Sequence, residues 1–325
     1  MTNFLRNFKQ VLIFLFLVFF ACLLALNKNL LQGAVNGIHL WVAIILPSLF
    51  PYFFITAILS KLDVIRSLSA RLNKPAKFFF NVNGVCLYAY FLSVISGYPI
   101  GSKIVADLYK NRLIDKNQAV RATAFCSNSS PMFMIVSVGA IMFNDKNFGL
   151  CLFLSNLLAT FFSGIIFRFY KKKEKEENVF IINSSKNYDN SFYDGVYSAV
   201  ISILVVGGII TLCSLLVETL TQLNILYPFI KFISIFTKDD KISVAIIYGL
   251  FESTKGLQQL SSAPFLLNLP IACFLVGFGG ISGIMQSVAF IKQAKIKTAP
   301  FFIAKILHAV LGFIFGIIFL KVFFV

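Results

Sequence analysis

The chain has 325 residues, of which 58% are hydrophobic and only 13% are charged. About a quarter of the residues of a soluble domain are charged, so this composition excludes an ordinary water-soluble protein. The net charge of +16 does not indicate nucleic-acid binding, because the basic residues stand in short clusters beside apolar runs, as in membrane proteins. The apolar runs approach the ~20 residues that a helix needs to cross a bilayer, and they lack the alternation of a β-barrel. The sequence therefore predicts an all-α polytopic membrane protein.

The first apolar run, at 11–31, follows Arg6 and Lys9. It is slightly longer than the core of a signal peptide, and no small-residue cleavage site follows it cleanly, so we expect an uncleaved span. The six cysteines are scattered without metal-ligand spacing, which is typical of small apolar helix residues. We expect no metal, no cofactor and no enzymatic activity, because the sequence lacks a nucleophile elbow, an H-E-x-x-H motif and a P-loop.

The remaining apolar stretches differ in continuity, and four of them are interrupted by Gly, Pro, Ser or charged residues. The expected elements are a span at 38–60, a stretch at 82–108 broken at 96–101, a stretch at 119–143 broken at 127–131, a span at 148–168, a span at 192–217, a short interfacial helix at 221–238, a stretch at 242–262 broken at 249–256, a stretch at 264–290 broken at 277–283, and a last span at 300–321.

Basic clusters set the orientation of the spans. If 82–108 crossed the bilayer once, the basic loops at 61–77 and 110–121 would face opposite sides. We therefore expect this stretch to enter from the cytoplasm and return, and 242–262 to enter from outside and return. The arrangement places twenty basic residues inside and six outside. It predicts two re-entrant hairpins that open to opposite sides.

An internal repeat supports this topology. An offset of 152 residues aligns Gly97 with Gly249 and Lys103 with Lys255, in the segments GYPIGSK and GLFESTK. The same offset aligns the second break of each half and two GIIF tetrapeptides. We expect one membrane domain, made of two inverted repeats that each carry a re-entrant hairpin and a broken transmembrane helix. Its expected parts are an N-terminal span at 1–37, a first repeat at 38–170, a cytoplasmic linker at 171–190 and a second repeat at 191–325.

Paired broken helices in inverted repeats are typical of secondary transporters. Backbone groups freed at a break inside a bilayer need protein, water or a solute as partners, so the breaks predict a polar site near the midplane. Two lysines beside few acids favour an anionic solute. The candidate substrate-binding residues are Gly97, Tyr98, Pro99, Gly101, Ser102, Lys103, Ser127, Asn128, Ser129, Ser130, Glu252, Ser253, Thr254, Lys255, Gly279, Gly280 and Ser282.

Each candidate also has a structural interpretation. Lys103 could pair with Asp107 or extend to the interface, and Glu252 could pair with Lys255 rather than bind a coupling proton. The serines at 127–130 could form a kink satisfied by neighbouring helices, or bind solute or Na⁺. Glycines near Ser282 could serve close helix packing. The coupling ion, H⁺ or Na⁺, and homo-oligomer formation stay open at this point.

The segments SGYPIGSKIVADLYKNRLID and AFCSNSSPMFMIVSVG, with GLFESTKG and GFGGISGIMQS in the second half, resemble the YlbJ-type sporulation integral membrane proteins of the nucleoside-recognition (Gate) superfamily. The resemblance covers nearly the whole chain. It implies an architecture shared with concentrative nucleoside transporters, a role in endospore formation and a place in the mother-cell-derived membrane around the forespore.

The resemblance also implies a substrate, dipicolinate, moved from the mother cell towards the forespore. This small dianion would suit the two lysines. The sequence therefore predicts a gradient-driven transporter or facilitator of a small organic anion, with the lipid bilayer as its surroundings and no nucleic-acid partner. A nucleoside or nucleobase transporter and a non-transporting sporulation scaffold are the alternatives.

Overall fold

The computed structural model describes residues 28–59, 64–171, 191–263 and 267–324, and they form helices without a strand among them. The predicted span at 11–31 lies largely outside the described residues, as does nearly all of the linker expected at 171–190. Within the described part, four helices are long and apolar enough to cross a membrane. These are Lys146–Phe167, Phe192–Gln222, the broken helix Asn268–Gln293 and Ala299–Phe323. The predicted all-α polytopic membrane fold is confirmed.

The described helices fall into two halves with the same order of elements: a long segment, an amphipathic helix, a hairpin, a broken helix and a long helix. The first half contains α2 (Lys28–Leu40), η1 (Trp41–Ile45), α3 (Leu46–Leu59), α4 (Val64–Phe80), α5 (Gly84–Ser96), α6 (Ile100–Lys110), α7 (Lys116–Phe125), η2 (Met132–Met142) and α8 (Lys146–Phe167). The second half contains α9 (Ser191–Gln222), α10 (Tyr227–Thr237), α11 (Asp240–Phe251), α12 (Ser253–Ser261), α13 (Asn268–Phe278), α14 (Gly280–Gln293) and α15 (Ala299–Phe323).

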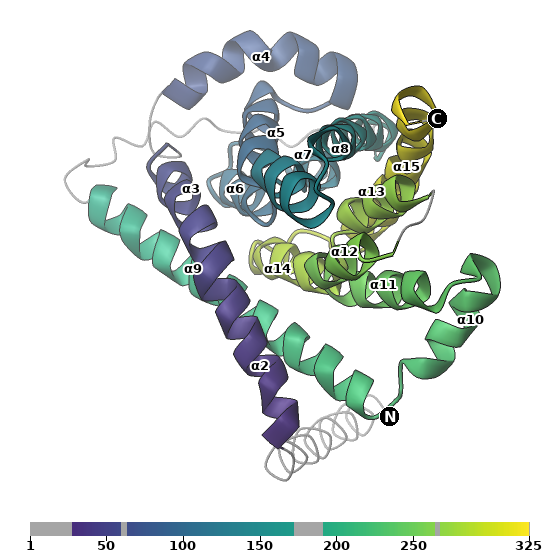
Figure 1. Ribbon diagram of the computed structural model, residues 1–325. Helices are drawn as coiled ribbons and strands as arrows, with labels where there is room; N and C mark the ends of the chain where they lie inside the picture. Colours follow the sequence, from purple (N-terminus) through teal and green to yellow (C-terminus); the bar gives the residue numbers. More distant parts are fainter. Residues whose placement is uncertain (1–27, 60–63, 172–190, 264–266, 325) are drawn as a thin grey trace, which may run out of the picture.

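Equivalent long helices of the two halves pack against each other in opposite directions. Gly37 of α2 lies against Thr211 of α9, whereas Ile58 of α3 lies against Gly195 near the beginning of α9. In Figure 1, α2 and α3 run along α9 on one side of the molecule. The helices α8 and α15 are likewise antiparallel, because Phe162 contacts Phe315 at 5.5 Å between ring centroids while Phe167 packs near Ala304. The two repeats are therefore inverted, as the sequence predicts.

The breaks occur where the sequence supplies residues that a helix does not tolerate. Gly97 has φ +87°, and Pro99 follows it at the tip between α5 and α6. Gly279 and Gly280 have φ +80° and +65°, which side chains with a Cβ rarely adopt, and they separate α13 from α14. The hairpin helices have 9 to 13 residues. Since a single span needs about 20, each hairpin turns back inside the molecule.

The basic segments gather at one end of the molecule, which we call the basic face. Arg121 donates to the Asn81 carbonyl at 2.6 Å and to the Tyr170 carbonyl at 2.9 Å. Lys110 donates to Gln293 at 3.1 Å, so α6 and α14 end on this face together. The segments near 77–84, 110–121, 168–171 and 292–298 thus share one side. At the opposite end, Ile242 near the start of α11 and Leu260 near the end of α12 belong to the same apolar cluster as Phe148 near the start of α8.

Two local expectations differ from the structure. Residues 32–37, expected between the first two spans, are helical, and the expected domain boundary at 37–38 falls inside α2. Gly33 and Gly37 let this helix approach α9 closely, which favours its continuation. The basic loop expected at 61–77 is largely the helix α4, which bends by 84° into α5. The apolar face of α4 packs Ala76 and Phe80 into the core while Lys77 stays exposed, an amphipathic pattern that a charge count does not reveal.

The arrangement predicts which introduced cysteines a membrane-impermeant reagent can reach from each side of a membrane. In a variant with its six cysteines replaced by alanine, Lys116→Cys and Lys292→Cys should react with an impermeant maleimide from one side. Lys146→Cys and Lys241→Cys should react only from the other, because all four side chains are exposed at helix ends of opposite faces. Reaction of positions 116 and 292 from different sides would contradict the inverted arrangement.

Candidate functional site

The tips of the two hairpins meet at the centre of the molecule. The Tyr98 hydroxyl lies 3.1 Å from Ser253 Oγ, which joins the tip of the first hairpin to that of the second. A Cβ on Gly97 would lie 3.0 Å from the Ser130 nitrogen, and one on Gly280 would lie 3.0 Å from the Phe251 carbonyl oxygen. Each hairpin tip therefore also contacts the break of a helix in its own repeat. All four breaks converge on one place.

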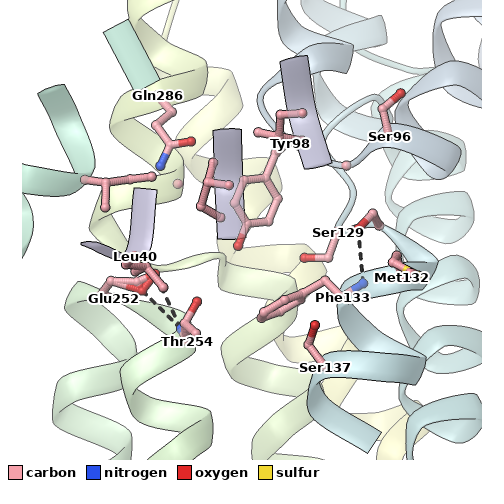
Figure 2. A pocket seen from close by; sticks show the side chains of 16 residues that line it. Leu40, Ser96, Tyr98, Ser129, Met132, Phe133, Ser137, Glu252, Thr254 and Gln286 are labelled. Atoms are coloured by element: carbon pink, nitrogen blue, oxygen red, sulfur yellow. Dashed lines mark hydrogen bonds between the residues drawn. The ribbon is translucent and has the colours of Figure 1, made fainter. Parts of the chain in front are cut away.

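A cavity of about 120 Å³ opens at this convergence. Its polar lining comes from both hairpin tips and both broken helices: Ser96, Gly97, Tyr98, Ser129, Ser130, Ser137, Glu252, Thr254, Gly283 and Gln286. Its apolar lining is Leu40, Ile45, Leu49, Met132, Phe133 and Ile210. Figure 2 shows Tyr98 in the middle of the view, with Glu252 and Thr254 towards one side and Ser129 towards the other. The volume suits several waters or a small solute.

Glu252 forms the turn between α11 and α12. Its side chain is 7% exposed, and its carboxylate oxygens accept from the Thr254 nitrogen at 3.1 and 3.4 Å. It is the N-cap of α12, where a negative charge is stabilised by the amide groups of the first turn. Since Glu252 also lines the cavity, the charge is placed at the site by the fold of the hairpin itself.

The break between α7 and η2 is held by side-chain hydrogen bonds. Asn128 donates to Ser93 Oγ at 2.8 Å and to the Phe125 carbonyl at 3.0 Å. Ser130 Oγ accepts from the Phe133 nitrogen at 3.2 Å and so begins the next helical segment. Asn128 therefore shapes the unwound segment, whereas Ser129 and Ser130 face the cavity. The neighbouring carbonyl of Ser127 accepts from Lys305 at 3.4 Å.

The two lysines aligned by the repeat do not line the cavity. Lys103 lies on α6 and forms an ion pair with Asp107 at 3.1 Å, the arrangement that the sequence offered as its structural interpretation. Lys255 follows Thr254 on α12, and its side chain is partly exposed. The structure thus does not bring the two ammonium groups together around the cavity.

Six of the seventeen candidates line the cavity: Gly97, Tyr98, Ser129, Ser130, Glu252 and Thr254. The other eleven candidates are outside its lining. Ser253 contacts Tyr98, and Ser282 accepts from Gln286 at 3.3 Å. Pro99 is the N-cap of α6, Gly101 and Ser102 are buried within that helix, and Gly279 is the N-cap of α14, which begins at Gly280.

Sequence reasoning missed several residues that the fold places here. Gly283 lies in the first turn of α14 and Gln286 in the second; Gly283 belongs to the break predicted at 277–283, and Gln286 follows that break. Leu40 and Ile210 come from the long helices, and no sequence signal pointed to them. Lys305 of α15 was also not among the candidates, although the sequence shows that it lies within an apolar span. Among the described residues, no group of three His, Cys, Asp or Glu side chains could hold a metal ion.

The fold and the cavity define a class: a multi-pass α-helical membrane protein with two inverted repeats that enclose a polar site. The chain is 26% identical over 309 residues to the sporulation integral membrane protein YlbJ of Bacillus subtilis (strain 168), a match that covers 87% of this chain and 76% of that protein. This similarity supports a YlbJ-type relationship. No protein-family model matches the chain, and no solved structure matches it.

Proposed function

We propose that this protein is a gradient-driven transporter or facilitator of a small organic anion. The observation that carries the proposal is the convergence of four helix breaks, two from each inverted repeat, on one polar cavity. Broken helices that meet between inverted repeats are the usual construction of a secondary-transporter site. Rocking of one repeat against the other would expose such a site alternately to the two sides, with Glu252 as the candidate group for a coupling H⁺ or Na⁺.

The relative's role in sporulation and the Gate-type resemblance point to a biological setting. We place the protein in the outer forespore membrane, with its basic face in the mother-cell cytoplasm, and assign dipicolinate as the substrate moved towards the forespore. The cavity's hydroxyls and Gln286 offer donors for carboxylate oxygens. The half-helices that begin at the breaks direct the positive ends of their dipoles towards the same place.

A nucleoside is the second candidate, and one observation favours it. Among the sixteen residues that line the cavity, the charged side chain is acidic, Glu252. The rings of Tyr98 and Phe133 beside Gln286 and serine hydroxyls would also suit a neutral base and sugar. A sporulation scaffold without transport requires no cavity, so the site gives it no support.

Uptake of labelled dipicolinate and uridine into proteoliposomes that contain the purified protein distinguishes these functions. We expect dipicolinate to accumulate above the level of protein-free liposomes, and uridine to remain at that level. Uptake of uridine with no uptake of dipicolinate would replace the anion by a nucleoside. Uptake of neither solute, with either a proton or a sodium gradient imposed, would contradict transport and favour the scaffold.

A further inference from the structure

Lys305 is a buried cation at the centre of the fold. It lies about two turns from the start of α15, a 25-residue apolar helix, and only 3% of its surface is exposed. Neighbouring residues Ile303 and Ile306 are exposed and face outwards, whereas Lys305 faces the interior with Ala304. A lysine that could extend to the membrane surface would not be enclosed in this way, so its position indicates an interior role.

The surroundings of Lys305 come from three of the four breaks or tips. Its ammonium donates to the Ser127 carbonyl at 3.4 Å, in the unwound segment of the first repeat. It lies 5.8 Å from the ring centroid of Tyr98, at the tip of the first hairpin. A Cβ on Gly279, in the break of the second repeat, would be 3.5 Å from the same ammonium.

These partners are a carbonyl and an aromatic ring, and neither carries a net charge. Among the described residues, no acidic side chain contacts Lys305, in contrast to Lys103 with its Asp107 at 3.1 Å. A carbonyl and a cation–π contact compensate a buried ammonium only in part. Ionisable residues in a membrane interior mark substrate or ion pathways, and a negative group would supply the partner that Lys305 lacks here.

Tyr98 connects this cation to the cavity. Its ring belongs to the cavity lining and also lies beside Lys305, while its hydroxyl reaches Ser253. One edge of the ring packs against Gly283, where a Cβ would lie 2.7 Å away, so this glycine leaves room for the aromatic side chain. The Tyr98 ring therefore lies at the border between the cavity and the ammonium.

We propose that Lys305, and not the repeat-aligned pair Lys103 and Lys255, supplies the positive charge that binds a carboxylate of the transported anion. The inference rests on the proposed function and names the residue that recognises the transported anion. The carboxylate replaces the Tyr98 ring as the partner of Lys305, and the hydroxyls of the cavity hold the remaining oxygens. The ligand class is a small mono- or dicarboxylate.

Binding of dipicolinate and of its neutral analogue pyridine-2,6-dicarboxamide to the purified full-length protein tests this assignment. We expect Lys305→Gln to weaken dipicolinate binding by about tenfold or more, the loss expected for a charged hydrogen bond. Lys305→Arg keeps the charge and should retain most of the affinity. Lys103→Gln is the matched control, because it removes another buried lysine, one that already has an acidic partner, and the affinity of this variant should stay near that of the wild type.

The neutral analogue separates recognition from misfolding. The unaltered protein should prefer the dianion to the diamide, and Lys305→Gln should lose that preference while it still elutes as a folded species in detergent. If Lys305→Gln kept the preference for the dianion, or if Lys103→Gln lost it instead, the role of Lys305 would be overturned. The proposal of anion transport would not be affected by that result. Absence of dianion binding by the unaltered protein would overturn both the anion as substrate and this inference.

Discussion

Substituting Gly101 by alanine should reduce transport by about tenfold or more and lower the stability of the protein. Gly101 lies on α6, where an added Cβ would overlap the carbonyl oxygen of Cys126 and the Cβ of Ser93. The first of these contacts is backbone, so it cannot be relieved by a side-chain rotation. Overpacking of this kind costs about 1–3 kcal/mol. The hairpin would be pushed away from the break at 126–131, and with it the cavity wall formed by Gly97 and Ser130.

Gly208→Ala is the matched control for this substitution. Gly208 lies within α9, and a Cβ there would meet no atom within 4 Å. Both substitutions add one methyl group to a glycine within a helix, which by itself favours the helix by at most about 0.5–1 kcal/mol. A difference between them in thermal unfolding and in dipicolinate uptake therefore reports the contact at Gly101. If Gly101→Ala behaved like Gly208→Ala, the hairpin and the break would be further apart than the structure places them.

The backbone of the site was predictable because local chemistry determines it. Gly97 and Pro99, the serines with Pro131, and Gly279 with Gly280 are residues that favour a break in a helix, and they stand close together in the sequence. Their recurrence at a constant offset then predicts that the breaks belong to equivalent elements. The inverted orientation followed from the distribution of basic residues, which depends on the membrane and not on details of packing.

The side-chain content of the site could not be predicted in the same way. Lys103 and Lys255 share a repeat position, but the side chain of Lys103 pairs with Asp107 one turn along its own helix. Lys305 reaches the centre because α15 packs beside the breaks, and the sequence shows only that a lysine lies within an apolar span. Leu40 and Ile210 line the cavity because α2 and α9 cross there. Such contacts depend on helix packing, which a repeat pattern does not specify.

Glu252→Ala should affect stability and transport together, because Glu252 both caps α12 and lines the cavity. Loss of the N-cap acceptor costs about 1 kcal/mol, which for a chain of this size lowers Tm by about 2 °C. Loss of the carboxylate at the cavity should reduce dipicolinate uptake by about tenfold or more if it holds the coupling ion. Glu252→Gln keeps an acceptor for the Thr254 nitrogen and should preserve Tm while it still loses uptake.

Asp239→Ala provides the control for the capping effect. Asp239 is the N-cap of α11 and accepts from the Lys241 and Ile242 nitrogens at 2.7 and 3.4 Å, at the opposite end of that helix from Glu252. Its removal should lower Tm to a similar extent and leave uptake near the wild-type level. If Glu252→Ala and Asp239→Ala showed equal uptake, Glu252 would act only as the N-cap of α12 and not as the coupling group. A coupling carboxylate would then have to lie outside the cavity, because no other acidic side chain lines it in the described part of the chain.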